Sequence, residues 1–308
     1  MTDAARDIQI LDTLRADQAQ EVLDLLATTA AEDGVQAVSE QGRLHLTGGP
    51  RDGIRHALLT AHDSLLGYAQ LDAGDPVEAT AVELLVHPSH RTRGHGRALA
   101  EAVLAATDHR LRAWAHGGKP AARHLARTLG LRLFRELRQL RMPLTDLALP
   151  GPVLPDGVAI RTFRPGEDDA AWLAANAEAF AHHPEQGSLT QRDLDDRKAE
   201  PWFDPAGFFL AERRSEGPGG EETTELVGFH WTKIQDGVGE VYVVGVRPDA
   251  QGGGLGKALT TIGLRYLAGR ELPTAMLYVD ADNKPAVTVY ERLGFTTYAT
   301  DLMYRTES

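Results

Sequence analysis

The 308-residue chain contains no cysteine, so disulfide bonds, thiolate zinc sites and a cysteine nucleophile are all excluded. It also lacks any run of 18 apolar residues, so no segment is expected to span a membrane. Its first residues, MTDAARDIQILD, are acidic and lack an apolar core, which argues against a secretory signal. A cytoplasmic protein, monomeric and without a metal, is therefore expected.

An excess of positive charge is missing as well. The formal net charge is −12, and residues 151–308 account for most of it. A surface of this sign argues against partners such as nucleic acid or an anionic membrane. It would suit a cationic amine as a small-molecule substrate, but a solvated acidic surface without any binding role explains it equally well.

The most informative stretch is residues 239–259, GEVYVVGVRPDAQGGGLGKAL. β-branched and aromatic residues predict a strand, and Pro248 ends it because proline has no N–H to donate. A glycine-rich loop from Gln251 to Gly256 follows, and a helix is expected to begin near Lys257. Such a loop can aim several N–H groups at one point, and the helix dipole adds positive potential there. The stretch is therefore suited to binding a phosphate or pyrophosphate.

The spacing separates the known phosphate-binding loops. A dinucleotide fingerprint requires G-x-G-x-x-G, and a Walker loop requires a hydroxyl residue after Gly-Lys, where this chain has Ala258. The pattern here is instead Q-x-x-G-x-G after V-x-P, which resembles the acetyl-CoA loop of the GCN5-related N-acetyltransferase (GNAT) superfamily. The resemblance implies an α/β fold with a mixed central sheet flanked by helices, and acetyl-CoA as cosubstrate. A glycine-rich turn without a ligand is the alternative.

The same pattern occurs twice, which predicts a tandem duplication of one α/β domain. Six residues of the first copy lie 160 positions before their matches in the second: Val86, Pro88, Arg91, Gly94, Gly96 and Leu99 against Val246, Pro248, Gln251, Gly254, Gly256 and Leu259. Pro143, Pro150, Pro152 and Pro155 indicate an extended linker. We therefore predict two GNAT domains, residues 1–142 and 158–308, joined by residues 143–157.

Hydrophobic periodicity predicts the elements of each copy. In the first copy we expect a helix that turns Val22, Leu25, Leu26 and Thr29 to one face, followed by a polar, glycine-containing segment over residues 32–53. In the second copy we expect a strand at 158–162, a loop at 182–187, and a hairpin loop at 215–224.

Acetyl transfer to an amine requires a base for the ammonium and donors for the thioester oxygen. Glu240 lies on the predicted central strand, and an alternation of two places Glu240, Tyr242 and Val244 on one face. A carboxylate there could deprotonate the substrate directly or through a water molecule. Gly245 is suited to a β-bulge that separates this strand from its neighbour and frees N–H groups. The alternative for Glu240 is a charge at the start of a strand.

Tyr290 is the predicted acid for the leaving thiolate. It stands in residues 283–295, which resemble the GNAT segment N-x-x-A-x-x-x-Y-x-x-x-G-F, and a core tyrosine on an amphipathic helix is the alternative. In the first copy the matching positions are Thr80 for Glu240, and Ala126 or Leu125 for Tyr290. Neither Ala126 nor Leu125 can donate a proton, and Glu83, three residues beyond Thr80, is expected on the opposite face of the strand. We therefore expect the first domain to bind acetyl-CoA without turning it over, with positive charge added by Arg91, Arg93 and Arg97.

The chain further resembles tandem members of the superfamily that acetylate the cysteinyl amine of Cys-glucosamine-inositol. The resemblance implies substrate contacts at Glu40, Glu185, Lys233, Glu240 and Tyr278, although each charge taken singly could be solvated surface. Because Glu40 lies in the first copy, its contact would require a substrate site between the domains. The implied acetyl-CoA contacts of the second copy are Val244, Gly245, Val246, Gln251, Gly252, Gly253, Gly254, Leu255, Gly256, Lys257, Asn283, Lys284, Pro285, Ala286, Val287 and Thr288. Those of the first copy are Leu84, Leu85, Val86, Arg91, Thr92, Arg93, Gly94, His95 and Gly96.

One departure and two alternatives stand beside this interpretation. Many relatives have arginine in the middle of the loop, where this chain has Gly252 and Gly253, so attraction for phosphate should be weaker. The amine could instead belong to a protein N-terminus, an aminoglycoside or a polyamine. A non-enzymatic acetyl-CoA sensor is the second alternative, and the presence of Glu240 and Tyr290 in one copy argues against it.

Overall fold

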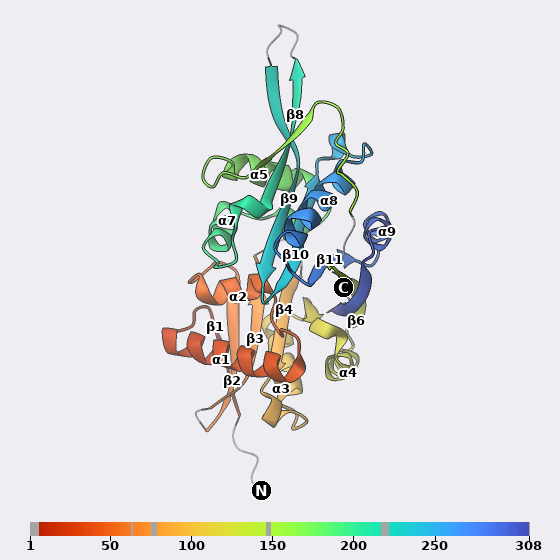
Figure 1. The fold of residues 1–308 in the computed structure, drawn as a ribbon. Helices are drawn as coiled ribbons and strands as arrows, with labels where there is room; N and C mark the ends of the chain where they lie inside the picture. Colours follow the sequence, from red (N-terminus) through yellow and green to blue (C-terminus); the bar gives the residue numbers. More distant parts are fainter. Residues whose placement is uncertain (1–5, 63, 75–78, 146–148, 217–221, 308) are drawn as a thin grey trace. The chain divides into compact units, whose positions relative to one another are not determined.

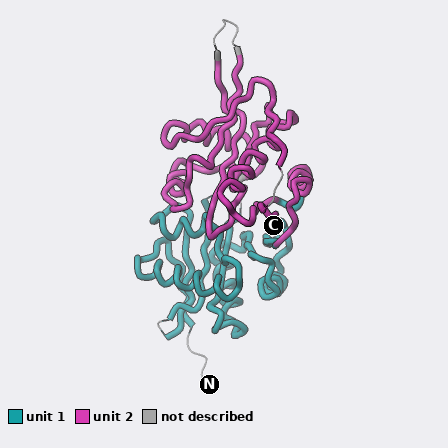
Figure 2. Tube along the Cα trace, in the orientation of Figure 1, with its two compact units in different colours: residues 1–138, 280–282, 299–308 teal, residues 139–279, 283–298 magenta. Residues whose placement is uncertain are grey.

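The computed structural model describes residues 6–62, 64–74, 79–145, 149–216 and 222–307 (Figure 1). The chain divides into two compact units, which Figure 2 colours teal and magenta. Unit 1 consists of Met1–Arg138, Asp280–Asp282 and Ala299–Ser308, and unit 2 consists of Gln139–Val279 and Asn283–Tyr298. The end of the second sequence copy therefore belongs to the compact unit built by the first copy.

Unit 1 contains a mixed sheet in the order β1-β2-β3-β4-β5-β12. Its strands are β1 (Asp7–Leu11), β2 (Ile54–Ala61), β3 (Ser64–Asp72), β4 (Thr80–Val86), β5 (Leu111–Ala115) and the end of β12 (Thr296–Arg305). Its helices are α1 (Ala16–Asp33), α2 (Glu40–Thr47), α3 (His95–Ala106) and α4 (Pro120–Thr128). The strand pairs β1–β2, β2–β3 and β3–β4 are antiparallel, whereas β4 and β5 are parallel.

Helices cover both faces of this sheet. The predicted face of α1 is buried as expected, and Val22, Leu25 and Leu26 pack on one side of the strands. On the other side, α3 buries Leu99 and Val103. The polar segment over residues 32–53, for which no regular element was predicted, contains α2. Its hydrophobic face is only one turn long, and Ser39 supplies the N-cap by accepting from the N–H of Gly42.

Unit 2 contains a second mixed sheet in the order β6-β11-β10-β9-β8-β7. Its strands are the end of β6 (Arg132–Pro143), β7 (Val158–Thr162), β8 (Phe208–Glu216), β9 (Glu222–Gln235), β10 (Val238–Val246) and β11 (Thr274–Asp280), and β12 begins in this unit. Its helices are α5 (Asp169–Ala179), α6 (Pro184–Gly187), α7 (Gln191–Lys198), α8 (Leu255–Ala268) and α9 (Lys284–Arg292).

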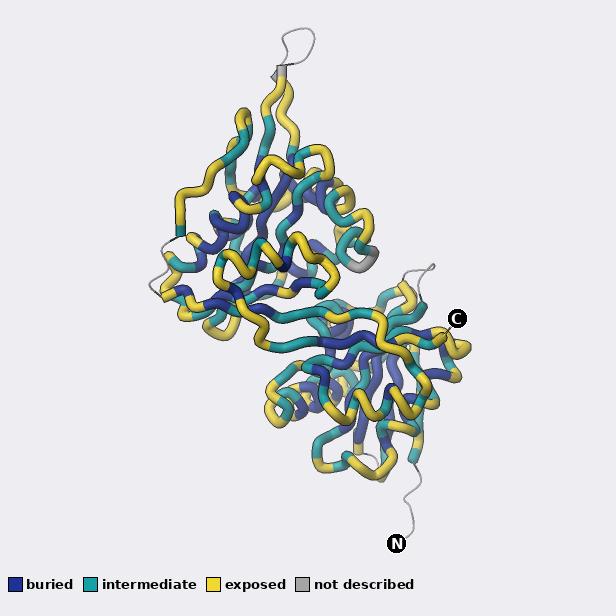
Figure 3. Tube along the Cα trace, turned by 90° about the vertical axis from the view of Figure 1, so that its right-hand side faces the viewer, coloured by how far each residue is buried: buried dark blue, intermediate teal, exposed yellow. Residues whose placement is uncertain are grey.

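The core of unit 2 also has two sides. Leu264 and Leu267 of α8 pack on one face, and an aromatic cluster that includes Trp172, Phe208 and Trp231 fills the other. Figure 3 shows the buried stretches, in dark blue, along the central strands. The predicted α/β fold with tandem mixed sheets is thereby confirmed.

Two predicted loops of unit 2 are partly regular. Residues 182–187 include the short helix α6. The predicted hairpin loop at 215–224 is wrong at both ends, because Ser215 pairs with Thr223 in a continuing ladder, and residues 217–221 lie outside the described part of the chain. Polar residues are tolerated there because the ends of both strands are exposed.

Candidate active site

The two parallel central strands of unit 2 are paired over only a short distance. The pairing joins Val238–Glu240 of β10 to Thr274–Met276 of β11, whereas β10 stays paired with β9 as far as Val246. The register shifts after Val241: Val241 pairs with Thr232, but Val243 pairs with Trp231. Two steps along β10 therefore correspond to one step along β9, which defines a β-bulge at Tyr242.

The prediction that the bulge lies at Gly245 is wrong. Gly245 pairs regularly with Phe229, and a Cβ there would lie 2.5 Å from Cζ of that ring. Glycine is needed at this position for close packing. The bulge also corrects the predicted alternation, because Tyr242 and Val243 both pack with the aromatic cluster while Val244 packs towards α8. Val244 therefore lies on the opposite face of β10 from Tyr242.

The side chain of Glu240 lies on the face that carries Tyr242. Glu240 stands directly opposite Lys233 on β9, and cross-strand partners share a face of the sheet. Lys233 is buried, with Nζ 4.7 Å from the centre of the Trp202 ring and 5.4 Å from that of Tyr242. The predicted base thus lies next to a lysine held by aromatic rings.

The loop that follows β10 has the shape required to hold an anion. Gly252 and Gly254 have φ of +86° and +84°, a region that glycine adopts without strain, and α8 begins at Leu255. Among the described residues, no heavy atom lies within 4 Å of where a Cβ would stand at either glycine. The first N–H groups of a helix have no acceptor within it. Gly252 to Lys257 therefore fit the pyrophosphate of acetyl-CoA.

Gln251, the first residue of the motif, stabilises this loop through a side-chain hydrogen bond. Its Nε2 donates to the carbonyl oxygen of Val246 at 3.0 Å. In unit 1 the matching Arg91 donates from Nε to the carbonyl oxygen of Val86 at 3.1 Å. The side chain at this motif position thus ties the loop to the end of the central strand in both units.

The loop of unit 1 has the same backbone features but less available positive charge than expected. Thr92 and Gly94 have φ of +60° and +79°, and α3 begins at His95. Both Arg91 terminal nitrogens lie 2.7 Å from the carboxylate of Asp33, whose pKa this arginine lowers. Arg97 pairs with Glu101 at 2.7 Å. These two arginines are therefore engaged with carboxylates of their own unit.

Tyr290 lies on α9, whose N-terminus is capped by Asn283. Its ring packs 5.8 Å from that of Phe295 and against the core that includes Val241 and Val287. Burial raises the pKa of Tyr290 to about 12. The phenol is therefore protonated at neutral pH, as a proton donor must be.

The unit 1 counterparts of these groups follow from the register. In unit 1, Val86 pairs with Gly67 and Ala81 pairs with Asp72, and the ladder between these two pairs is unbroken. The matching pairs of unit 2 are Val246 with Gly228 and Glu240 with Lys233, and the ladder between them contains the bulge. Because the bulge adds one residue to β10, Ala81 and not the predicted Thr80 corresponds to Glu240. Ala81, like Thr80, has no carboxylate, so unit 1 lacks a counterpart of the predicted base.

Helix-end hydrogen bonds settle the counterpart of Tyr290. The N–H of Phe295 donates to the carbonyl oxygen of Tyr290 at 3.0 Å, and that of Leu131 donates to the oxygen of Ala126 at 2.9 Å. Since Leu131 and Phe295 follow the matching glycines, Ala126 and not Leu125 corresponds to Tyr290.

The remaining predicted substrate residues lie on several elements. Tyr278 on β11 is 43% exposed, and its hydroxyl accepts from Nε2 of Gln139 at 2.8 Å. Glu185 lies in α6, and Glu40 is the first residue of α2 in unit 1. Unit 2 therefore contains four of the five predicted substrate residues.

An ionic network in unit 1 was not predicted. The Nε2 of His116 lies 2.7 Å from Oε1 of Glu83, and its Nδ1 lies 3.1 Å from Oδ2 of Asp301 on β12. Glu83 also accepts from the backbone N–H of Ser39 at 2.9 Å. Burial alone would lower the pKa of His116, but the hydrogen bonds to Asp301 and Glu83 raise it to about 10. Because 185 residues separate His116 from Asp301, no local sequence signal could have revealed this network.

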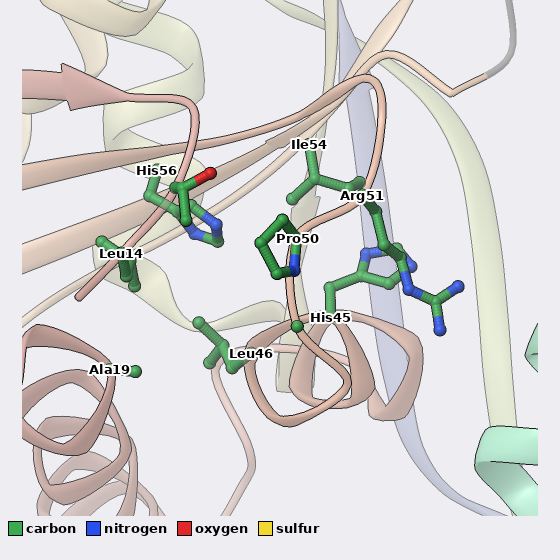
Figure 4. A pocket seen from close by; sticks show the side chains of 10 residues that line it. Leu14, Ala19, His45, Leu46, Pro50, Arg51, Ile54 and His56 are labelled. Atoms are coloured by element: carbon green, nitrogen blue, oxygen red, sulfur yellow. The ribbon is translucent and has the colours of Figure 1, made fainter. Parts of the chain in front are cut away.

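A small pocket in unit 1 is lined by residues of α2, β2 and the segments beside them, including His45, Arg51 and His56 (Figure 4). None of the predicted site residues lines it. Burial, followed by the charge of His45, lowers the pKa of His56 to about 4, and its Nδ1 lies 2.7 Å from the hydroxyl of Tyr68. The neutral His56 imidazole is therefore a hydrogen-bonded part of the core.

Within the described ranges, no group of three or more His, Asp or Glu side chains is placed to hold a metal ion. In the same part of the chain, no helix is both long and apolar enough to cross a membrane.

The model of the Acetyltransferase (GNAT) family matches the chain twice, over residues 20–131 and 173–295. The chain belongs to this acetyltransferase family. As a GNAT acetyltransferase it uses acetyl-CoA as its cosubstrate, so the predicted enzyme class and cosubstrate are confirmed. The two matches also confirm the predicted duplication.

Several curated relatives are similar over almost the whole chain. A "Mycothiol acetyltransferase" of Streptomyces avermitilis is 70% identical and covers 99% of this chain and 97% of its own length. One of Streptomyces coelicolor is 68% identical over 98% of the chain and 96% of its own length. One of Thermomonospora curvata is 49% identical, with 97% of each chain covered.

Solved structures share the tandem GNAT fold. A "Tandem GNAT protein from the clavulanic acid biosynthesis pathway" has a TM-score of 0.68 at 20% identity and covers 98% of each chain. A GCN5-related N-acetyltransferase from Sphaerobacter thermophilus has a TM-score of 0.66 at 24% identity, covering 97% of this chain and 95% of its own. At these identities the likeness concerns the fold alone.

Proposed function

We propose that the protein transfers the acetyl group of acetyl-CoA to the cysteinyl amine of Cys-glucosamine-inositol, which yields mycothiol. The observation that carries the proposal is the identity of 68–70% to relatives named mycothiol acetyltransferase over almost the full chain. Such identity leaves little room for a different amine-binding site. The predicted proton-transfer groups of this reaction, Glu240 and Tyr290, are also both present in unit 2.

The proposed roles follow from the positions of the groups. Acetyl-CoA supplies a thioester that is activated for attack by an amine. Gln251 to Lys257 would hold its pyrophosphate. The N–H groups of Val244 and Val246, on the edge of β10 beyond its pairing with β11, would hydrogen-bond to the carbonyl oxygen, while Gly245 lies between them. Glu240 would take the proton from the cysteinyl ammonium, and Tyr290 would protonate the leaving thiolate.

The second set of contacts gives unit 1 a different proposed role. Leu84 to Val86 and Arg91 to Gly96 form a strand, loop and helix start like those of unit 2. Ala81 and Ala126 stand where unit 2 has its carboxylate and phenol. We therefore propose that unit 1 binds acetyl-CoA without transferring its acetyl group.

A panel of amines tests this function. Release of CoA thiol is measured with Cys-glucosamine-inositol, an aminoglycoside, a polyamine and an N-terminal peptide, all at equal concentration. We expect kcat/KM for Cys-glucosamine-inositol to exceed that of every other amine by at least about 100-fold, a ratio that buried polar recognition readily supplies. A higher value for any other amine would overturn the substrate assignment.

Tyr290→Phe is expected to lower kcat by about 10- to 100-fold, because the leaving thiolate loses its proton donor while the packing of the ring is retained. The KM for acetyl-CoA should change by less than about twofold. Steady-state kinetics measured by thiol release provide the check. Tyr298→Phe, which alters an exposed tyrosine on β12, is the matched control and should behave as wild type. An unchanged kcat for Tyr290→Phe would remove the phenol from the mechanism.

A further inference from the structure

The residue at the bulge of β10 is held from several directions. The hydroxyl of Tyr242 accepts from Nε of Arg197 at 2.8 Å, and its ring lies 5.1 Å from that of Trp202 and 5.3 Å from that of Trp231. Arg197 is itself buried on α7, where Nη1 donates to the carbonyl oxygen of Asp193 at 2.9 Å. A buried guanidinium thus fixes the side chain that stands at the register shift.

This register shift determines which groups face the opening between β10 and β11. In a strand, successive N–H groups point to opposite edges and successive side chains to opposite faces. One extra residue therefore reverses both assignments for everything that follows it. Without the bulge, the amides and side chains of Val244 to Val246 would be out of phase with Glu240.

In unit 1, the described residues of the matching strand β4 show no such bulge in their pairing with β3. Residues Ala81 to Val86 of β4 pair in order with Asp72 to Gly67 of β3, in a ladder without a shift. Unit 1 also lacks the carboxylate and phenol of the proposed mechanism. The bulge and the proton-transfer groups therefore occur together, in one copy of the repeat.

We propose that Tyr242 and Arg197 are positioning residues for acetyl transfer: the hydrogen bond between them holds the β10 bulge and so keeps Glu240 and the edge amides in phase. The proposal rests on the acetyl transfer proposed above. Neither residue needs to touch the substrate, because both act through the backbone of β10.

Tyr242→Phe and Arg197→Met test the proposal, alone and combined. Each single variant is expected to lower kcat by about 10- to 100-fold, the loss that a misplacement of about 1 Å produces, with KM for acetyl-CoA changed less than about threefold. The double variant should lose no more than the worse single variant, because both remove the same hydrogen bond. Arg197→Lys keeps a hydrogen-bond donor at this position, so its kcat should lie between that of Arg197→Met and that of wild type.

Tyr266→Phe is the matched control. Tyr266 also accepts from an arginine, Arg270, at 2.6 Å, and its hydroxyl lies 2.5 Å from Asp204, but it stands on α8. Loss of this hydroxyl should leave kcat at the wild-type value. The proposal would be overturned if Tyr242→Phe and Tyr266→Phe lost equal amounts of kcat. It would also be overturned if the losses of Tyr242→Phe and Arg197→Met were fully additive in the double variant.

Amide hydrogen exchange separates this inference from the proposed function. In Tyr242→Phe, amides of residues 241–246 should exchange at least about tenfold faster than in wild type, and in Tyr266→Phe they should not. Kinetics are measured with whichever amine of the panel the wild type acetylates best. If no amine is acetylated, the proposed function fails, but amide exchange still tests whether the Tyr242–Arg197 hydrogen bond holds the bulge. Unchanged amide exchange in Tyr242→Phe would rule out that role, whatever the substrate is.

Discussion

Glu240→Gln is expected to lower kcat by about 100- to 10,000-fold, the range that loss of a general base produces. Glutamine keeps the size and hydrogen-bonding ability of the side chain opposite Lys233 but cannot accept the proton of the substrate ammonium. KM for acetyl-CoA should stay within about twofold, because the loop proposed to hold the pyrophosphate begins at Gln251 and is unchanged in this variant. The measurement is steady-state release of CoA thiol over a range of pH.

The pH dependence adds a second test of this role. With a carboxylate base, kcat/KM of the wild type falls on the acidic side as the base becomes protonated, and Glu240→Gln should lose that limb. Thr80→Ala, on the matching strand of unit 1, should leave kcat nearly unchanged. If both variants lost activity equally, Glu240 would not be the specific base.

His116→Gln is expected to destabilise unit 1 by about 3–5 kcal/mol, the cost of removing one partner from a buried ion pair. The carboxylates of Glu83 and Asp301 would then face each other without the imidazolium between them. Because Asp301 lies on β12, the variant should also weaken the attachment of that strand to β5. Unfolding by denaturant, followed by circular dichroism, measures the change.

The sign of the pH effect follows from the raised pKa of His116. A group whose pKa is about 10 when folded, against 6.5 when unfolded, contributes its full stabilisation below pH 6.5. That contribution is lost progressively as the pH rises from 6.5 to 10. The difference in unfolding free energy between wild type and His116→Gln should therefore shrink over this window. His124→Gln, an exposed histidine of α4, should match wild type within about 0.5 kcal/mol, and a constant difference across the window would contradict the ionic role.

The strand, loop and helix of the proposed acetyl-CoA site could be predicted because each part depends on residues close in sequence. Pro248 ends β10, Gly252 and Gly254 have positive φ, and α8 follows immediately. Such features arise from steric limits on the backbone, which act over a few residues. The repeat made the prediction stronger, since the same local chemistry occurs at Arg91 to Gly96.

The position of the bulge could not be predicted in the same way. Gly245 is the residue type that bulges favour, yet the shift lies at Tyr242, where Arg197 and the rings of Trp202 and Trp231 hold the side chain. The choice depends on contacts from α7 and β9, about 10 to 45 residues away. A local pattern carries no information on such contacts. Thr80 is the predicted counterpart of Glu240 because a constant offset of 160 positions leaves out the extra residue of the bulge, and the strand register makes it Ala81.

The sequence alone determined the fold family and the duplication, and it led to the proposal that Glu240 and Tyr290 transfer protons, because these inferences follow from residue types at fixed local spacing. Tertiary structure decided which face of β10 each side chain occupies, how the arginines near the unit 1 loop are engaged, and which compact unit receives the last strand. These outcomes depend on packing and ion pairs between segments far apart in the sequence, such as His116 and Asp301, which are 185 residues apart. Their energies are realised only when the folded chain brings those segments together.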